Sequence, residues 1–596
     1  MLKTEEIIGW VIPALFATSL LMGCGEREPQ AEPDAEAAAA AEPAQEAIAE
    51  PYRLQQTLYL GGDIVTMAPG GPESAEAVVQ REGRIVFVGS EAEAMERFEG
   101  KADIVDLAGN TLLPGFIDAH GHLKGVGLQA VVADLLPPPD SDVDSIETLQ
   151  SKLAAWGESE RSQRIGWVVG FGYDDAQLAE QRHPTRDELD VVSTERPVFI
   201  VHQSGHLYVA NSKLLELAGI TAETEDPPGG VIRRRPGSNE PNGVLEETAL
   251  MAVLGVFPEV GETGQRAMVS EGVKLYTRFG FTTAQEGRAS PDDLRIFQTM
   301  ADAGELDIDV VAYPDYWMTK GMLDDNPWMG REYRGRFRIG GVKGNLDGSP
   351  QGKTAWLTEP YHVPPEGREA DYAGYGMLQD EQALAMFDEA YAKGWQVLNH
   401  ANGDAAMDQM IRAARAATEK YGPADRRTVS IHSQTIRPDQ LDAYQELGII
   451  PSFFGMHTFY WGDWHRDSVL GPERAAFISP ARAALDRGML YTQHHDAPVA
   501  LPSSIAILAA QVNRTTRSGE VLGPDQRVTP MDALRSITIN AAYQYFEEDS
   551  KGSIEVGKLA DFVILDANPL EIEPAAIWDI EVVETIKEGK SVYRAD

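Results

Sequence analysis

Short apolar stretches alternate with helical patterns through the middle of this chain, and that alternation restricts the fold more than any other feature. Strands that alternate with helices are typical of an α/β fold with a parallel sheet. We therefore expect a (β/α)8 TIM-like barrel over residues 113–545. The nine candidate strands are 116–120, 198–202, 281–285, 308–313, 339–343, 396–400, 429–432, 449–453 and 490–496. Since a closed barrel needs eight strands, we expect 308–313 or 339–343 to lie outside it.

The first candidate strand ends on His120 and His122, which are separated by one residue. Side chains at positions i and i+2 of an extended strand point the same way, so both imidazoles can reach one metal ion. A His-x-His pair also fits two ordinary polar residues at the start of a loop. The choice depends on whether other strands supply further ligands.

Four later candidate strands end on residues that can serve as metal ligands, one of them a lysine that would need to be modified to do so. Strands 396–400 and 429–432 end on His400 and His432, strand 490–496 ends on Asp496, and strand 339–343 ends on Lys343. Active sites of β/α barrels lie at the carboxyl ends of the strands. These side chains together therefore form a ligand set for one or two divalent metal ions, and zinc is the expected metal. Any one histidine alone would more simply be a hydrogen-bonding residue.

Both ends of the chain are rich in short β patterns separated by glycine turns. We expect residues 55–112 and 546–596 to form one small β-sandwich domain, because the ends of compact domains often lie close together.

The first 23 residues resemble a lipoprotein-type signal peptide, with an apolar run that ends in Leu-Met-Gly before Cys24. That resemblance implies cleavage before Cys24 and lipidation of its thiol, which would place the protein on the periplasmic face of a membrane, foremost the outer membrane, or on the cell surface. An uncleaved amino-terminal anchor is the alternative. Residues 24–54 are rich in alanine, glutamate and proline and are expected to form a disordered linker.

The formal net charge of −42 argues against nucleic-acid binding and against docking on anionic lipid by charge, so the only expected membrane contact is the lipid anchor. Cys24 is the single cysteine, which excludes a disulfide and a thiolate metal site in the mature domain. The composition leaves a homo-oligomer open.

Two segments resemble the amidohydrolase superfamily: Pro114 to His122, reading PGFIDAHGH, and Gly552 to Asp561, reading GSIEVGKLAD. Shorter motifs resemble amidohydrolase family three, the group that contains N-substituted formamide deformylase. These motifs are Ser204-Gly205-His206, Val209-Ala210-Asn211-Ser212-Lys213, Asp226-Pro227-Pro228-Gly229-Gly230, Gly243-Val244-Leu245-Glu246-Glu247, Val342-Lys343 with Asp347-Gly348-Ser349, His400 with Gly403-Asp404, and Asp496-Ala497-Pro498-Val499. The chain departs from the family pattern at Ser204, Asn345-Leu346 and Ile431.

The resemblance implies a ligand set. His120, His122 and Asp496 would hold one metal ion, His400 and His432 would hold a second, and a carboxylated Lys343 would bridge the two. Alternatively, Lys343 is unmodified and orients the substrate. Chemistry supports the bridge only for the carbamate, which is an oxygen donor, because a free ammonium repels cations.

We expect a hydrolase that acts on carbon–nitrogen bonds other than peptide bonds, in an amide, N-formyl or N-acyl amine. Metal-activated hydroxide would attack the acyl carbon, Asp496 would serve as general base, and His206 would stabilise the oxyanion unless it only ties a loop. Two alternatives remain: a lactonase, cyclic amidase or deaminase on the same site, or an exported binding or regulatory protein on an inactive scaffold.

Aromatic residues and histidines in loops after two late strands are candidates for contact with a small amide-like substrate. They are Tyr316, Trp317, His457, Trp464 and His495. Aromatic side chains at a barrel mouth can form an apolar pocket, although packing against the rim would explain them equally well.

Overall fold

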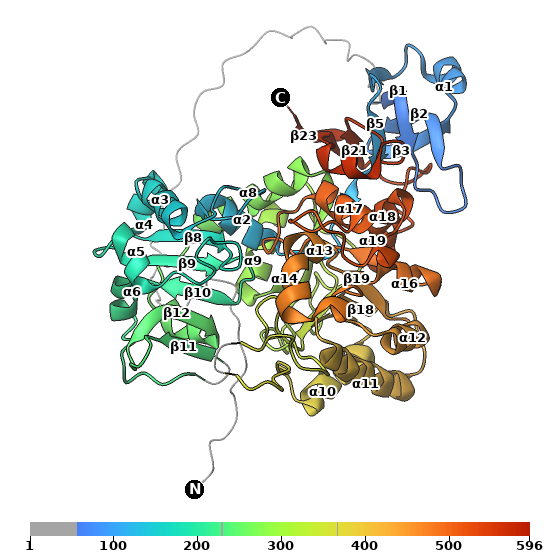
Figure 1. Cartoon of the computed structure of the whole chain (residues 1–596). Coiled ribbons are helices and arrows are strands. Elements are labelled where there is room, and N and C mark those ends of the chain that lie inside the picture. Colours follow the sequence, from blue (N-terminus) through green and yellow to red (C-terminus); the bar gives the residue numbers. More distant parts are fainter. Residues whose placement is uncertain (1–55, 228–229, 366–367, 596) are drawn as a thin grey trace, which may run out of the picture.

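The computed structural model describes residues 56–227, 230–365 and 368–595 (Figure 1). The predicted signal peptide, Cys24 and the predicted linker 24–54 lie outside the described residues. Among the described residues, no helix combines enough length with enough apolar character to cross a lipid bilayer.

Two parallel sheets occupy the centre of the α/β structure. The first has the order β15-β14-β13-β6, and the second has the order β16-β17-β18-β19-β20. Their strands are β6 (Phe116–Ile117), β13 (Phe281–Ala289), β14 (Asp309–Pro314), β15 (Phe337–Ile339), β16 (Gly341–Asn345), β17 (Gln396–Ala401), β18 (Val429–His432), β19 (Ile450–Phe453) and β20 (Thr492–Gln493). The predicted strand 308–313 corresponds to β14, and 339–343 overlaps β15 and β16. Both therefore contribute to the central sheets, and neither lies outside them as the sequence analysis expected.

The two parallel sheets contact each other at both of their edges. Strands β15 and β16 are separated only by Gly340, where a Cβ atom would lie 2.6 Å from the ring of Tyr313, so the close approach of the ring requires glycine. At the other edge, the backbone N–H of Asp496 donates to the carbonyl of His120 (3.2 Å). The loops after β6 and β20 are thereby joined directly.

Helices connect the strands, and their ends follow the expected cap chemistry. Helix α9 (Pro291–Ala303) begins with a capping box between Ser290 and Asp293 and ends at Gly304, which adopts a left-handed conformation. Helices α10 (Asp380–Lys393) and α12 (Pro438–Leu447) also end at left-handed glycines. Helices α2 (Leu123–Val131), α8 (Glu262–Arg278), α11 (Asp404–Tyr421), α17 (Ser504–Asn513) and α18 (Pro530–Ser536) complete the set used below.

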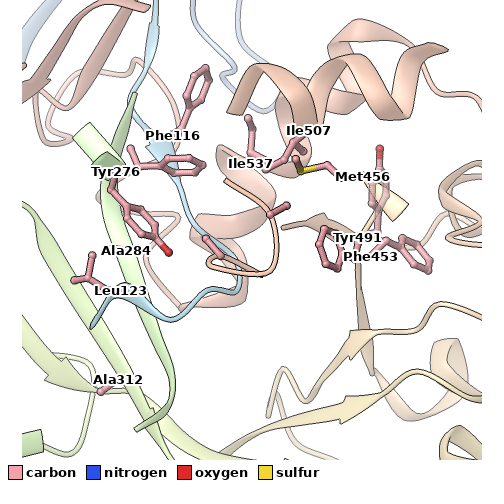
Figure 2. Packing of buried hydrophobic residues seen from close by; sticks show 14 of the residues in the cluster. Phe116, Leu123, Tyr276, Ala284, Ala312, Phe453, Met456, Tyr491, Ile507 and Ile537 are labelled. Atoms are coloured by element: carbon pink, nitrogen blue, oxygen red, sulfur yellow. The ribbon is translucent and has the colours of Figure 1, made fainter. Parts of the chain in front are cut away.

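One apolar core packs these helices against strands of both parallel sheets. Figure 2 shows part of it, including Phe116 of β6, Tyr276 of α8, Phe453 of β19 and Ile507 of α17. Burying side chains of this size stabilises the fold by about 1.5–3 kcal/mol each. The core therefore fixes the strand ends that carry the candidate ligands.

A separate six-stranded sheet lies between α2 and α8 in the sequence, with the order β11-β12-β10-β9-β8-β7. Its strands are β7 (Ala133–Asp134), β8 (Val168–Tyr173), β9 (Val198–His202), β10 (Leu207–Ala210), β11 (Gly230–Arg234) and β12 (Pro241–Glu247). Helices α3 (Ile146–Gly157), α4 (Glu160–Ile165), α5 (Arg186–Val192) and α6 (Ser212–Leu217) accompany it (Figure 1). Separate apolar cores contain Val168 and Ile200 in one case and Phe171 and Phe199 in the other.

This sheet corrects the strand assignment made from the sequence. The prediction placed 198–202 in the barrel, but β9 pairs with β8 and β10 in the six-stranded sheet. A strand buried on both faces has the same apolar pattern in either sheet, so periodicity could not separate the two cases.

Both ends of the described chain contribute to one eight-stranded sheet, with β5 (Thr111–Pro114) antiparallel to β21 (Phe562–Leu565). The other strands are β1 (Gln56–Val65), β2 (Ser74–Arg81), β3 (Arg84–Gly89), β4 (Asp103–Asp106), β22 (Val582–Lys587) and β23 (Lys590–Arg594), and helix α1 (Glu91–Phe98) follows β3. The two ends therefore share a sheet, whereas the sandwich form stays a prediction.

A buried ionic cluster joins this terminal sheet to β14. Asp309 Oδ2 lies 2.6 Å from the amine of Lys587 and 2.7 Å from the amine of Lys551. Lys587 also lies 2.8 Å from Asp561. Charges this deeply buried need partners, and the cluster supplies them across the contact between the two sheets.

Candidate metal centre

Six side chains from different strand ends line a single cavity of about 220 Å³. His120 and His122 follow β6, Lys343 lies in β16, His400 in β17, His432 ends β18, and Asp496 follows β20. These are the six residues that the sequence analysis named as metal ligands, and the structure brings all of them together. We refer to this space as the metal-centre cavity.

Asp496 lies at the middle of the group. Its Oδ1 is 3.1 Å from Nε2 of His120 and 3.3 Å from Nε2 of His122. Its Oδ2 is 3.9 Å from Nε2 of His432. The donor atoms of His120, His122 and Asp496 all lie within 4.8 Å of one another, close enough to share one ion.

Hydrogen bonds behind the first two rings decide which nitrogens face the cavity. His120 Nδ1 lies 2.6 Å from the side-chain oxygen of Gln285, and His122 Nδ1 contacts the carbonyl of Gly287. Both partners are acceptors, because the amide nitrogen of Gln285 already donates to Ala119 and Tyr545. Each Nδ1 therefore carries the proton, and each Nε2 keeps a lone pair toward Asp496.

The other two histidines form a second facing pair. His400 Nε2 lies 3.1 Å from the carbonyl of Gly348, which makes Nε2 the donor and leaves a lone pair on Nδ1. That Nδ1 is 3.0 Å from Nε2 of His432. Buried Asp347 supports the loop beyond His400 by accepting hydrogen bonds from the backbone N–H groups of Asn402 and Gly403.

The donor set fits a divalent cation. Asp496 Oδ1 is buried and accepts no hydrogen bond from any described residue, although two imidazole lone pairs point toward it. An arrangement of lone pairs and a carboxylate oxygen is unfavourable by itself, and a cation between them satisfies all three. Nitrogen and oxygen donors of this kind suit zinc.

Two of the candidate ligands have an unusual backbone conformation. His432 has φ 75° and Asp496 has φ 52°, both in the left-handed region that disfavours residues with a side chain. Such residues persist only where the surrounding structure holds them, and they cluster at functional sites.

Burial determines the charge state of the cavity. It lowers the pKa of His120 to about 4 and that of Lys343 to about 7. Burial also holds the pKa values of His400 and His432 well below the usual value, whereas the pKa of Asp496 lies well below its own usual value despite burial, because imidazole groups surround it. The site therefore offers neutral imidazoles and an ionised carboxylate, which are the protonation states that metals bind.

His206, the predicted oxyanion donor, lines the same cavity from the loop between β9 and β10. Its Nδ1 lies 2.9 Å from the carboxylate of Glu247. Burial lowers the pKa of His206, but the charge of Glu247 outweighs this and raises it overall. Glu247 thus orients the ring and favours its protonated form, in which both nitrogens are donors and Nε2 can donate toward the cavity.

The sequence analysis did not assign roles to Glu247, Gln285 or Arg288. Glu247 ends a motif used only for the resemblance, and Gln285 ends the predicted strand 281–285. Arg288 lines the metal-centre cavity, and its Nε donates to Asp315 (3.0 Å). Gln285 and Arg288 could have been found from the sequence, because polar residues at or after the carboxyl end of a parallel strand often belong to the active site.

The five predicted substrate-binding residues lie elsewhere among the described residues. None of Tyr316, Trp317, His457, Trp464 and His495 lines the metal-centre cavity. Tyr316 donates to Glu389, Trp464 donates to the carbonyl of Gln351, and His457 contacts His465. The aromatic residues of the cavity wall are instead Phe171 and Tyr208, from the six-stranded sheet.

A second group of potential metal ligands consists of Asp174, Asp175 and His202. The backbone N–H of Ser204 donates to His202 Nδ1 (3.0 Å), so Nε2 carries the proton and donates to Asp175 (3.0 Å). Asp174 accepts from the indole of Trp461 (2.9 Å). These hydrogen bonds satisfy the imidazole of His202 without a metal ion. We therefore interpret the group as a structural contact between the six-stranded sheet and Trp461.

Known proteins resemble this chain over most of its length. Residues 103–593 match a family model described as an amidohydrolase family. The protein LONG AFTER FAR-RED 3 of Arabidopsis thaliana is 30% identical over 554 residues, which cover 90% of this chain and 91% of that protein. The N-substituted formamide deformylase of Arthrobacter pascens is 27% identical over 87% of this chain and 95% of its own length.

A solved structure is also similar. The crystal structure of an uncharacterized metal-dependent hydrolase from Pyrococcus horikoshii matches with a TM-score of 0.70 and 25% sequence identity. The match covers 87% of this chain and 99% of that one.

Proposed function

Because the chain belongs to the amidohydrolase family, we propose that it is a metal-dependent hydrolase that cleaves a non-peptide carbon–nitrogen bond in an amide, N-formyl or N-acyl amine. One observation carries the proposal. Nε2 of His120, Nε2 of His122 and Oδ1 of Asp496 converge in a cavity that Lys343, His400 and His432 also line. The name of the Arthrobacter relative supports the choice of bond.

We propose that the two parallel sheets form one closed eight-stranded barrel, with β15 and β16 as a single strand interrupted at Gly340. A parallel bridge between Asp315 and Lys343 and the hydrogen bond from Asp496 to His120 support closure at the two edges. The carboxyl ends of all the strands would then open toward the metal-centre cavity.

In the proposed site, His120, His122 and Asp496 would hold one metal ion, and His400 and His432 would hold a second. Lys343 joins the two if its amine is carboxylated, and otherwise orients the substrate. Bound zinc supplies Lewis acidity, which lowers the pKa of a coordinated water and polarises the substrate carbonyl.

The chain's own residues handle the protons. Asp496 accepts a proton from the water that adds to the amide carbon, and passes it to the nitrogen as the carbon–nitrogen bond breaks. The products are a carboxylic acid and an amine. His206, oriented by Glu247, donates from Nε2 to the carbonyl oxygen as negative charge develops there.

Metal analysis together with a substrate panel tests the proposal. The purified chain should contain zinc or another divalent metal and should hydrolyse acyclic N-formyl or N-acyl amines. A chelator should abolish turnover, and zinc should restore it. Turnover of lactones, cyclic amides or amino-substituted rings alone would favour the alternative reactions. A folded protein that neither binds metal nor hydrolyses any member of the panel would favour a binding or regulatory role.

A further inference from the structure

A second cavity, of about 550 Å³, lies beside the metal-centre cavity. Its lining residues come from α2 and α8, from β8 and β9 of the six-stranded sheet, from α3 and α4, and from residues 257–261. We call this space the tail cavity. Its volume is typical of sites that bind small molecules.

Four apolar side chains line both cavities: Leu128, Phe171, Val201 and Met268. The two spaces are therefore separated by no more than these side chains. Met268 is unbranched, with several rotatable bonds, and Leu128 is only half-buried, so both can turn aside for a ligand.

The walls of the two cavities differ in character. Beyond the shared residues, the tail cavity is lined mainly by apolar groups, among them Val131, Val132, Trp156, Trp167, Val169 and Phe257, and its charged lining residues are Arg161, Arg164, Glu259 and Glu262. The metal-centre cavity instead carries the candidate ligands together with Glu286 and Arg288. A molecule that spans both spaces must therefore be polar at one end and apolar at the other.

Transfer of an apolar group from water to the tail cavity is favourable in proportion to the apolar area that it removes from water. A reacting carbonyl has the opposite requirement, because it must reach the histidines and Asp496. A substrate whose scissile bond lay at the candidate ligands would therefore extend an apolar chain past Phe171 and Met268.

We propose that the tail cavity binds the aliphatic chain of a long-chain N-acyl amine while its amide carbonyl lies at Asp496. This assignment of substrate class rests on the proposed hydrolase function. The carboxylic acid product keeps the chain, so the product also occupies the tail cavity.

Two substitutions fill the tail cavity without touching the metal-centre cavity. Ala267 is exposed on α8 and lines only the tail cavity, so Ala267→Trp projects a large side chain into it. Val169→Phe fills it from β8. Ala416→Phe is the matched control, because Ala416 is an exposed residue of α11 and lines neither cavity.

Product binding to the full chain is measured by calorimetry, with laurate and acetate as probes. We expect the native chain and Ala416→Phe to bind laurate at least tenfold more tightly than acetate. In Ala267→Trp and Val169→Phe this preference should fall at least tenfold, with circular dichroism unchanged. Equal laurate binding by all four proteins would overturn the tail-cavity assignment.

Hydrolysis separates this inference from the proposed function. The ratio of kcat/KM for an N-lauroyl amine to that for its N-acetyl counterpart should fall at least tenfold in both filled variants. If the enzyme hydrolyses the N-acetyl amine and both variants leave the ratio unchanged, the tail-cavity assignment is wrong but the hydrolase function stands. If neither amide is hydrolysed, but laurate binds more tightly than acetate and both variants weaken its binding, the hydrolase function is wrong but the tail-cavity assignment stands.

Discussion

The side-chain nitrogen of Lys343 lies 3.2 Å from Nε2 of His120, the nitrogen that also faces Asp496. A lysine and a histidine that were both charged would repel strongly at this separation in a buried site. Burial lowers the pKa of Lys343 to about 7 and that of His120 to about 4, so both can be neutral near neutral pH. A neutral amine can add carbon dioxide, which an ammonium cannot.

We expect Lys343 to carry a carbamate. Protein equilibrated with ¹³C-labelled bicarbonate should show a protein-bound carbamate carbon by NMR, and Lys343→Ala should lose that signal. Activity of Lys343→Ala should fall by more than the about 10–100-fold typical of losing a residue that only supports a metal ligand. Short carboxylic acids should restore part of it, because they replace the missing oxygen donor.

Lys152→Ala is the control for the labelling experiment. Lys152 is a surface residue paired with Asp142, so its removal should leave the carbamate signal and the activity as they are. A native protein that shows no labelled carbamate, yet turns over substrate normally, would favour the unmodified lysine.

Asp496→Asn should lower kcat by about 10²–10⁴-fold, the range that a positioned proton acceptor contributes. Asparagine keeps the shape of the side chain but cannot take the proton of the attacking water. Steady-state kinetics of zinc-loaded protein would measure the loss, with Asp388→Asn on the surface of α10 as the charge-matched control. Near-normal turnover in Asp496→Asn would exclude it as the general base.

His206→Gln should lower kcat by about 10²–10³-fold, as removal of an oxyanion donor does. Glu247 contacts the ring of His206 and not the cavity ligands, so we class it as a positioning residue. Glu247→Gln should move the basic limb of the kcat profile to lower pH. The reason is that Glu247 raises the pKa of His206, and the donor is lost as pH rises through that pKa.

Glu246→Gln provides the matched control for that profile. Glu246 is the neighbouring acid, but it pairs with Arg233 instead of His206. Its substitution should leave the basic limb in place. If the basic limb shifts equally in both variants, its pH is determined by the overall negative charge of the region and not by the contact between Glu247 and His206.

The candidate metal ligands could be predicted from one rule: polar residues at the carboxyl ends of parallel strands lie close together at one end of the sheet. That rule needs no knowledge of side-chain contacts, and it identified His400 and His432 although they are far apart in sequence. It could not place Val198–His202 in the six-stranded sheet, because the apolar pattern of a buried strand is the same in either sheet.

The cavity walls were less predictable than the ligands. Aromatic residues in loops after the late strands were candidates for substrate contact. Tyr316 and Trp464 instead donate hydrogen bonds to other segments of the chain. Phe171 and Tyr208 reach the cavity only because the six-stranded sheet packs over it. That packing depends on how two sheets meet, which periodicity along the chain does not encode.

The proposed lipid anchor makes a prediction about the cell. If Cys24 is acylated after cleavage of the signal peptide, the protein should fractionate with membranes and incorporate labelled palmitate. Cys24→Ala should remove the label. The native chain appearing unlabelled in the soluble fraction would contradict the anchor.

Asp309→Asn should destabilise the protein and reduce its sensitivity to acid. Burial opposes ionisation of Asp309, but the charges of Lys551 and Lys587 lower its pKa well below the usual value. A lowered carboxyl pKa contributes stability above the ordinary pKa of about 4, and that stability is lost as pH falls further. Removing one partner from a buried ionic cluster typically costs about 3–5 kcal/mol. Thermal unfolding at pH 7 should therefore show a large drop in Tm, and the difference from the native chain should shrink from pH 4 downward. A difference that stays constant to pH 2.5 would mean that Asp309 acts through packing alone.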